Sequence, residues 1–304
     1  MRHRPGTLSA TAGKILIAAA CLMAAAGVAA QQFDEGLNLS AGRHRFERPA
    51  ALSVSPTGEQ IAISDPTLGR IGVVDYRGRP LWSVGDQVNL DQPLAVCFLP
   101  DNELLFSLAS SHLILKISRD NPTVLDTVTD LDAWFRKDQH ADGIIAARDG
   151  RYLVLDKSGG RILRFDKDWK FVDIPIKSGS GKGRTLAPTA LSVLPDGRMV
   201  VTDRKNYPAQ MFGPDGSVLF NFGWNTPAEE RGWEAVAVAI DSRQVIWIAD
   251  ETNDMFRLFD AAGTQVSTVP FPSPLFRPIA LTGTIDNRML VIDDRGEAVY
   301  YTLQ

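Results

Sequence analysis

The stretch IWIADETNDMFRLFDAAGT, Ile246–Thr264, contains two short apolar runs, each followed by a polar turn. Both runs are too short for a helix and are bounded by turn-forming residues, so each predicts a β-strand. The acid Asp250 closes the first run. Whether it marks a unique site or one unit of a repeat decides how the rest of the chain is interpreted.

A turn of similar character occurs six times, in SPTGE, LPDNE, ARDGR, LPDGR, IDSRQ and TIDNR. From Thr57 to Asp286, the central residues of these turns are 44, 48, 47, 46 and 44 positions apart. A short apolar segment precedes each turn and another follows it. Self-similarity at this period, with strands around each turn, is typical of a β-propeller.

The second strand of most units ends in an acid, and the second repeat has Ser107 there instead. In four units an acid or a glycine follows ten residues later: Asp65–Asp75, Asp156–Asp166, Asp203–Gly213 and Asp250–Asp260. A third strand lies between these positions and a fourth apolar segment completes the unit. The sequence therefore predicts an all-β fold, a six-bladed β-propeller of four-stranded antiparallel blades. A residue that recurs in most blades cannot mark one site, so we expect Asp250 and its counterparts to accept hydrogen bonds from turn N–H groups.

The segments VTDRKN…AQMFGPDG and IADETNDMFRLFDAAG resemble the NHL repeat, and the resemblance covers residues 48–304. It implies a propeller that presents its loop faces to partners. Gluconolactonase-like hydrolases and peptide-amidating lyases are similar propellers that place a metal in the channel. In such folds an N-terminal strand commonly completes the last blade, which removes exposed sheet edges. The resemblance thus implies that residues 31–47 close the ring, through Leu37–Phe46.

The first thirty residues form a different kind of segment. Arg2, Arg4 and Lys14 precede the apolar run Ile15–Ala30, which ends in small residues before Gln31. This order is typical of a secretory signal peptide, so we expect residues 1–30 to be cleaved and the mature chain to begin near Gln31. The expected location is the periplasm or the exterior, without a membrane association after cleavage. A membrane anchor and a lipoprotein acylated at Cys21 are the alternatives.

Removing the three cations of the signal peptide moves the formal net charge from −4 to −7. This negative balance argues against nucleic acid as a partner. Cys97 is the only cysteine of residues 31–304, so no intramolecular disulfide forms, and its apolar surroundings predict a buried, inert thiol. We expect a monomer.

The residues just before the first strand of each blade stand at the mouth of the central funnel of a propeller. Aligning the repeats places Arg48, Gln92, Trp233 and Arg277 there as candidate ligand-binding residues. His140, Asp142 and Glu234 bring proton- and metal-handling groups to the same ring. The two carboxylates suit Ca²⁺ or Zn²⁺, and His140 is the candidate catalytic base. Alternatively, these side chains pair with one another and plug a wet channel.

Three stretches interrupt the repeat. The segment Lys177–Pro188 is rich in Gly and Ser and offers Lys182 and Arg184, either as a mobile connection or as a flap that binds an anionic ligand. The segment Asn225–Ala235 has the capping residues of a brief helix. Residues Asp130–His140 predict one or two helical turns.

Two functions remain open at this level. The leading hypothesis is an exported binding module for a small molecule or a protein partner, with no certain cofactor. The alternative is a metal-dependent hydrolase or lyase acting on a small molecule in the funnel. In that case Asp142 and Glu234 hold a Ca²⁺ or Zn²⁺ ion, His140 acts as the base, and Arg48 with Arg277 holds an anionic group.

Overall fold

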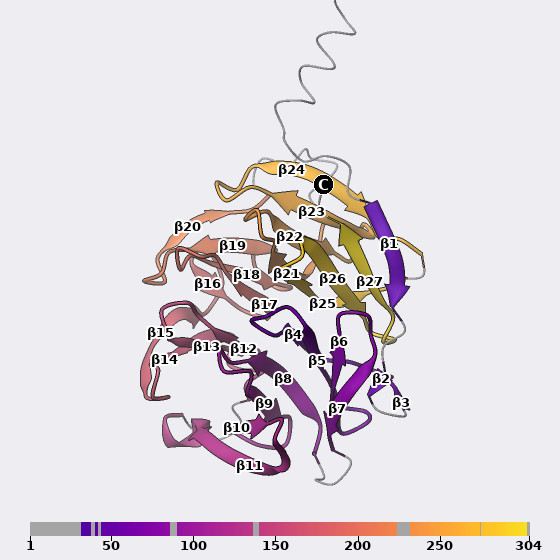
Figure 1. The fold of residues 1–304 in the computed structure, drawn as a ribbon. Coiled ribbons are helices and arrows are strands. Elements are labelled where there is room, and N and C mark those ends of the chain that lie inside the picture. Colours follow the sequence, from indigo (N-terminus) through magenta and orange to yellow (C-terminus); the bar gives the residue numbers. More distant parts are fainter. Residues whose placement is uncertain are drawn as a thin grey trace, which may run out of the picture.

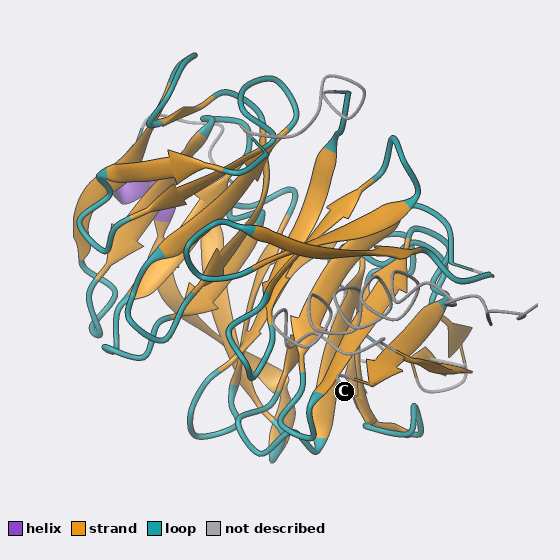
Figure 2. Cartoon of the chain, turned by 90° about the horizontal axis from the view of Figure 1, so that it is seen from above, coloured by secondary structure: helices purple, strands orange, loops and turns teal. Residues whose placement is uncertain are grey.

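The structure is a computed structural model that describes residues 32–37, 40–41, 44–85, 90–135, 140–223, 232–273 and 275–302. The predicted signal peptide at 1–30 lies outside these residues. Strands make up nearly all of the regular structure, as Figure 2 shows. In the described ranges no helix is long and apolar enough to span a membrane.

Six sheets follow one another around a ring (Figure 1). The first three blades are β4–β7 (Ala51–Val54, Gln60–Asp65, Arg70–Asp75, Pro80–Val84), β8–β11 (Pro93–Phe98, Leu104–Leu108, Leu113–Ser118, Asn121–Asp130) and β12–β16 (Gly143–Ala146, Tyr152–Asp156, Arg161–Phe165, Phe171–Ser178, Arg184–Thr185). The next two are β17–β20 (Pro188–Val193, Met199–Asp203, Ala209–Phe212, Val218–Asn221) and β21–β24 (Ala235–Ile240, Ile246–Asp250, Met255–Phe259, Gln265–Pro270). The predicted all-β six-bladed propeller is confirmed.

The sixth sheet joins the two ends of the chain. It contains β25 (Pro278–Gly283), β26 (Arg288–Asp293), β27 (Ala298–Thr302) and, antiparallel to β27, the N-terminal strand β1 (Gln32–Leu37) (Figure 1). The paired strand β1 thus lies within residues 31–47, as expected, but it precedes the part Leu37–Phe46 that we expected to pair. A small hairpin of β2 (Ser40–Ala41) and β3 (His44–Arg45) leads into the first blade. That β1 holds the ring closed remains a prediction.

The core is divided among the contacts between blades. Each of six apolar clusters in the described chain joins two neighbouring blades. One of them packs Phe46, Ile61 and Ile63 against Leu290 and Tyr300, which links the first blade to the last. Successive residues of an inner strand face the two neighbouring blades in turn: in β22, Ile246 and Ile248 belong to one cluster and Trp247 and Ala249 to the other, so the whole strand is buried.

The recurring acids have the structural role that the repeat predicted. Asp203 accepts hydrogen bonds from the N–H groups of Leu186 and Ala187 before the first strand of its blade, and from Lys205 and Asn206 in the following turn. Asp65 makes the same contacts in the first blade. Each buried carboxylate therefore ties the entry of a blade to the turn between its second and third strands, where the N–H groups would otherwise lack partners.

The sequence analysis placed the position of the recurring acid in the second blade one residue too early, at Ser107. Leu108 pairs with Pro93, just as Asp203 pairs with Pro188, so Leu108 occupies the position of the acid in the second blade. Ser107 instead accepts a hydrogen bond from the Ala95 N–H at 3.1 Å and donates one to the Ala141 carbonyl of the next blade.

The two predicted helical segments, Asp130–His140 and Asn225–Ala235, are each described only in part. Leu131–Ala133 forms a single 3₁₀ turn, capped by Asp130, which accepts from the Asp132 N–H at 2.9 Å. The predicted helix at Asn225–Ala235 falls mostly on residues outside the described chain, and Ala235 begins β21.

Candidate funnel site

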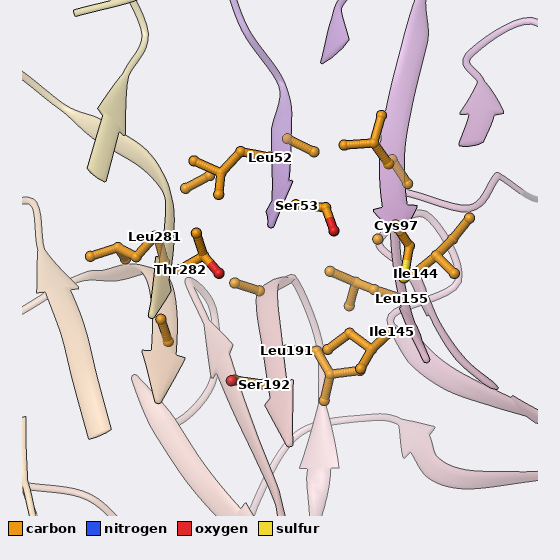
Figure 3. A pocket seen from close by; sticks show the side chains of 18 of the residues that line it. Leu52, Ser53, Cys97, Ile144, Ile145, Leu155, Leu191, Ser192, Leu281 and Thr282 are labelled. Carbon is orange, nitrogen blue, oxygen red and sulfur yellow. The ribbon is translucent and has the colours of Figure 1, made fainter. Parts of the chain in front are cut away.

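The first strands of all six blades surround a central cavity of about 420 Å³. Figure 3 shows Leu52, Leu191, Leu281 and Ile145 around this space, with the hydroxyl of Ser192 among them. The side chains of the wall are mainly aliphatic, but hydroxyl and backbone polar groups make up more of its exposed surface than carbon does. A cavity of this size is within the range of about 300–1,000 Å³ typical of small-molecule sites.

One mouth of the cavity collects charged residues from two positions in each blade. The residue before the first strand and the residue after the second strand are neighbours: the Arg204 N–H donates to the Ala187 carbonyl at 3.0 Å, and the Glu251 N–H donates to the Glu234 carbonyl at 3.0 Å. The sequence analysis used only the first of these positions. The second, directly after the recurring acid, adds Lys157, Arg204, Glu251 and Asp294.

Arg204, Glu234, Glu251 and Arg277 form a continuous ion-pair network across blades four to six. Arg204 Nε lies 2.8 Å from Glu234 Oε1, and its Nη2 lies 2.7 Å from Glu251 Oε2. Arg277 Nε lies 2.5 Å from the other oxygen of Glu251. The predicted residues Glu234 and Arg277 thus meet through Arg204 and Glu251, which the sequence analysis missed. Both arginines are about half exposed, so these pairs shape the mouth more than they stabilise the fold.

Asp142 and Lys157 are the two charged residues that line the cavity itself, within the part of the chain that is described. The backbone N–H of Lys157 donates to Asp142 Oδ2 at 2.8 Å, which fixes the carboxylate beside the base of the lysine side chain. Neither side chain has a partner at ion-pair distance among the described residues. They are an acid and a base at the edge of an apolar chamber, without the neutralising contacts of the Arg204 network.

Burial shifts both groups toward their neutral forms. Loss of solvation raises the pKa of the Asp142 carboxyl above its usual value, against the opposing effects of the Lys157 N–H and charge. Loss of solvation also lowers the pKa of the Lys157 ammonium, and the positive charge of Arg204 acts in the same direction. The Lys157 side chain is nevertheless exposed along the funnel, so solvent still screens its charge.

The other predicted ligand-binding residues lie in several places. Arg48, Gln92 and Arg277 are exposed at the mouth, as expected, although none of them lines the cavity. Trp233 is only 8% exposed and packs against the Phe259 ring and the Arg257 guanidinium. We correct its assignment: Trp233 is a core residue, because its indole fills the contact between blades four and five.

The loop with Lys182 and Arg184 is fastened beside the fourth blade. Asn206 Nδ2 donates to the carbonyls of Gly181 and Arg184 at 2.8 and 2.6 Å, and the Gly183 N–H donates to Gln210 Oε1 at 2.8 Å. The Lys182 and Arg184 side chains are exposed and do not line the cavity. These contacts do not fit a free flap over the funnel.

His140 also lies off the cavity wall. Its ring stacks on that of His112, with 6.4 Å between the centroids, and His112 Nε2 lies 3.2 Å from Asp132 Oδ2. Neither His140 nor His112 lines the funnel cavity. The placement of His140 therefore favours a contact between blades two and three over a role as catalytic base in the channel.

The predicted metal ligands do not form a metal site. The described residues contain no group of three or more His, Cys, Asp or Glu side chains that could hold an ion. Glu234 is already paired with Arg204, and Asp142 accepts the Lys157 N–H. A Ca²⁺ site needs six to eight oxygens and a catalytic Zn²⁺ site needs three protein ligands, so the donor set present fits neither ion.

Cys97 faces the same cavity but is not a nucleophile. Its side chain is buried, and loss of solvation raises the pKa of the thiol to about 11. A thiol with this pKa is almost entirely protonated near neutral pH, and only the thiolate is reactive. The prediction of a buried, inert thiol is confirmed.

The fold is shared with known propellers of low sequence identity. The chain is similar to virginiamycin B lyase from Staphylococcus aureus, with 17% identity, 90% of this chain and 89% of that chain covered, and a TM-score of 0.62. It is also similar to a candidate gluconolactonase, with 14% identity, coverage of 88% and 91%, and a TM-score of 0.65. A streptogramin B lyase matches at 15% identity over 90% and 88% of the two chains, with a TM-score of 0.60. The expected likeness to gluconolactonase-like propellers is thus confirmed at the level of the fold.

No protein-family model matches the sequence, and neither does any curated protein. Identities below one fifth carry the fold but not the chemistry. What the funnel does must therefore be argued from its own residues.

Proposed function

We propose that the protein is a binding module that holds a small molecule in its central funnel. The observation that carries this proposal is the chamber, lined by aliphatic side chains and by polar backbone and hydroxyl groups, whose mouth bears Asp142 and Lys157 without ion-pair partners among the described residues. An apolar cavity with a few convergent polar groups of perturbed pKa is the usual form of a ligand site. We also propose that the module works outside the cytoplasm, on the strength of the N-terminal segment 1–30.

The competing structural role, a plug of mutually paired charges, accounts for one side of the mouth only. Arg204, Glu234, Glu251 and Arg277 satisfy one another. Asp142 and Lys157 do not follow this pattern, although burial works against the charged form of each. Retaining two such groups at a cavity costs stability, and this is expected where they serve a ligand.

A fluorescent apolar probe tests the proposal directly. An environment-sensitive naphthalene dye should bind with increased emission, and it should compete with the natural ligand in extracts of the surroundings in which the protein works. Ser192→Trp fills the chamber from the wall shown in Figure 3 and should abolish dye binding while the protein remains folded. Should the variant misfold, Thr282→Phe, on the first strand of the sixth blade, replaces it. Dye binding that is unchanged in a folded, filled variant contradicts the proposal.

Catalysis is the second candidate, as hydrolysis or elimination within the same chamber. It is favoured by the opposite pKa shifts of Asp142 and Lys157, since such pairs occur at sites of acid–base chemistry. The metal-dependent form of this hypothesis finds no fitting ligand set among the residues that the structure describes. Adding Ca²⁺ or Zn²⁺ should therefore leave the melting temperature unchanged, whereas a marked increase would revive it.

A further inference from the structure

We infer that the ligand of the funnel is a small zwitterion with an apolar substituent, whose carboxylate pairs with Lys157, whose ammonium pairs with Asp142, and whose apolar part enters the chamber. This inference rests on the proposed binding function and specifies its ligand class. The chemistry is that of a free apolar amino acid or a close analogue of one.

The first argument is the charge pattern of the mouth. Asp142 Oδ2 is fixed by the Lys157 N–H at 2.8 Å, so the carboxylate and the origin of the lysine side chain are held together. Both groups line one cavity, and their charges influence each other. A ligand that carries both an anion and a cation can pair with both of these groups at once. A simple anion would be repelled by Asp142, and a simple cation would be repelled by Lys157.

The second argument is the position of Arg204. Its charge opposes that of Lys157, and the carboxylates of Glu234 and Glu251 already occupy its donors. A ligand carboxylate placed on Lys157 relieves this repulsion without breaking the Arg204 network. Lys157 is therefore the cation of the cavity wall that is available to an anionic group.

The third argument is the wall beyond the pair. Leu52, Leu191 and Leu281 line the chamber from three different blades, each beside a hydroxyl group, of Ser53, Ser192 and Thr282 respectively (Figure 3). At about 420 Å³ the space suits one aliphatic or aromatic substituent rather than a folded partner or a long peptide. Burying that substituent supplies affinity, at about 25 cal/mol per Å² of apolar surface, and the charged pair supplies orientation.

Calorimetry with matched probes separates the three contributions. L-Leucine or L-phenylalanine should bind the intact mature chain, whereas glycine, which lacks the apolar part, should bind at least tenfold more weakly. Isopentylamine lacks the carboxylate and 4-methylvalerate lacks the ammonium, and each should lose about ten- to a hundredfold in affinity. Equal affinity for leucine and either truncated probe would overturn the inference.

Two variants assign the charges to residues. Lys157→Met should weaken leucine binding but not isopentylamine binding, and Asp142→Asn should weaken leucine binding but not 4-methylvalerate binding, because each variant removes a charge that repels the truncated probe. Lys167→Met is the matched control, because Lys167 is an exposed lysine paired with Asp168 and does not line the chamber. A loss of leucine binding in the Lys167 variant but not in the Lys157 variant would refute the assignment.

Failure of this inference differs visibly from failure of the binding function. Suppose that the apolar dye binds the wild type but not the variants with a filled chamber, and that no zwitterion competes with the dye. The inference about the ligand class is then wrong, whereas the proposed binding function stands. If neither the dye nor any probe binds the folded protein, both proposals are wrong.

Discussion

Arg257 Nε lies 2.8 Å from Asp250 Oδ2, and both side chains are almost completely buried, with 2% and 0% of their surface exposed. Asn253 Nδ2 donates to the same carboxylate oxygen at 2.8 Å, and the Arg257 guanidinium lies over the Trp233 ring at 5.2 Å. Asp250 therefore does more than accept hydrogen bonds from the following turn, which is the role that the repeat predicted. It is also the counter-ion of a cation buried between two blades.

Removing this carboxylate should cost more stability than removing a turn acceptor. We expect Asp250→Ala to lower the free energy of unfolding by about 3–5 kcal/mol, because Arg257 is left buried without its partner. Urea unfolding of the purified protein measures this. Asp168→Ala is the control, since Asp168 pairs with Lys167 on the open surface and its loss should leave stability nearly unchanged.

The double variant Asp250→Leu/Arg257→Met tests the physical cause. Replacing both buried charges with apolar groups should recover most of the loss, because the desolvation penalty disappears with the pair. If Asp250→Ala unfolds like the wild type, the acid does not have the structural role assigned to it.

The blades could be predicted from the sequence because each one is specified locally. Turns, short β-branched runs and a recurring acid lie within one period of about 45 residues, and the contacts between blades follow from strand alternation. The mouth was only half predictable. Glu251 and Arg204 reach it because the residue after the acid lies beside the residue before the first strand, a relation that depends on how two strands pair.

Irregular register explains the remaining errors. Between Pro188 and Ala190 the pairing with β18 shifts by one residue, and similar shifts occur where β8, β21 and β25 begin. An extra residue at that point reverses which side chain faces the neighbouring blade. Trp233 stands just before such an irregular entry, and its burial could not be derived from repeat spacing alone.

The N-terminal strand gives a prediction about closure of the ring. Deleting residues 1–37 removes β1 and leaves β27, with the β-prone sequence AVYYT, as an exposed edge. Such edges pair with other chains, so the truncated protein should aggregate or melt at a clearly lower temperature. A chain that begins at Gln31 retains β1 and is the control. Light scattering and thermal unfolding of the two proteins decide the matter, and identical behaviour would show that β1 is dispensable.

Export gives a prediction that is independent of the fold. The secreted or periplasmic protein should begin near Gln31, since Val28 and Ala30 provide the small residues before the cleavage site. N-terminal sequencing or intact mass of the exported product measures this. A product that begins with an acylated Cys21 would identify a lipoprotein, and an uncleaved chain would indicate a membrane anchor.

Asp142 and Lys157 give the sharpest test of the site, because their effects on stability and on binding should have opposite signs. The pKa of Asp142 is raised above 3.8, so its ionised form is disfavoured in the folded protein. Its contribution to stability is most favourable at low pH and declines as the pH rises from 3.8 through the raised pKa. The lowered pKa of Lys157 affects stability at alkaline pH. The contribution of Lys157 to stability becomes more favourable only as the pH rises through the lowered pKa toward 10.5.

Burial therefore disfavours the charged form of each group in the folded protein. Asp142→Asn keeps an oxygen for the Lys157 N–H and removes the charge, so it should raise the melting temperature at pH 7. This advantage should shrink as the pH falls through the raised pKa and disappear below 3.8, where the wild-type carboxyl is protonated in both states. Lys157→Met should likewise stabilise the unliganded protein at pH 7, whereas the control Asp168→Asn should not. If both variants are less stable than the wild type at pH 7, the pair is a structural ion pair and the case for a ligand at this mouth is lost.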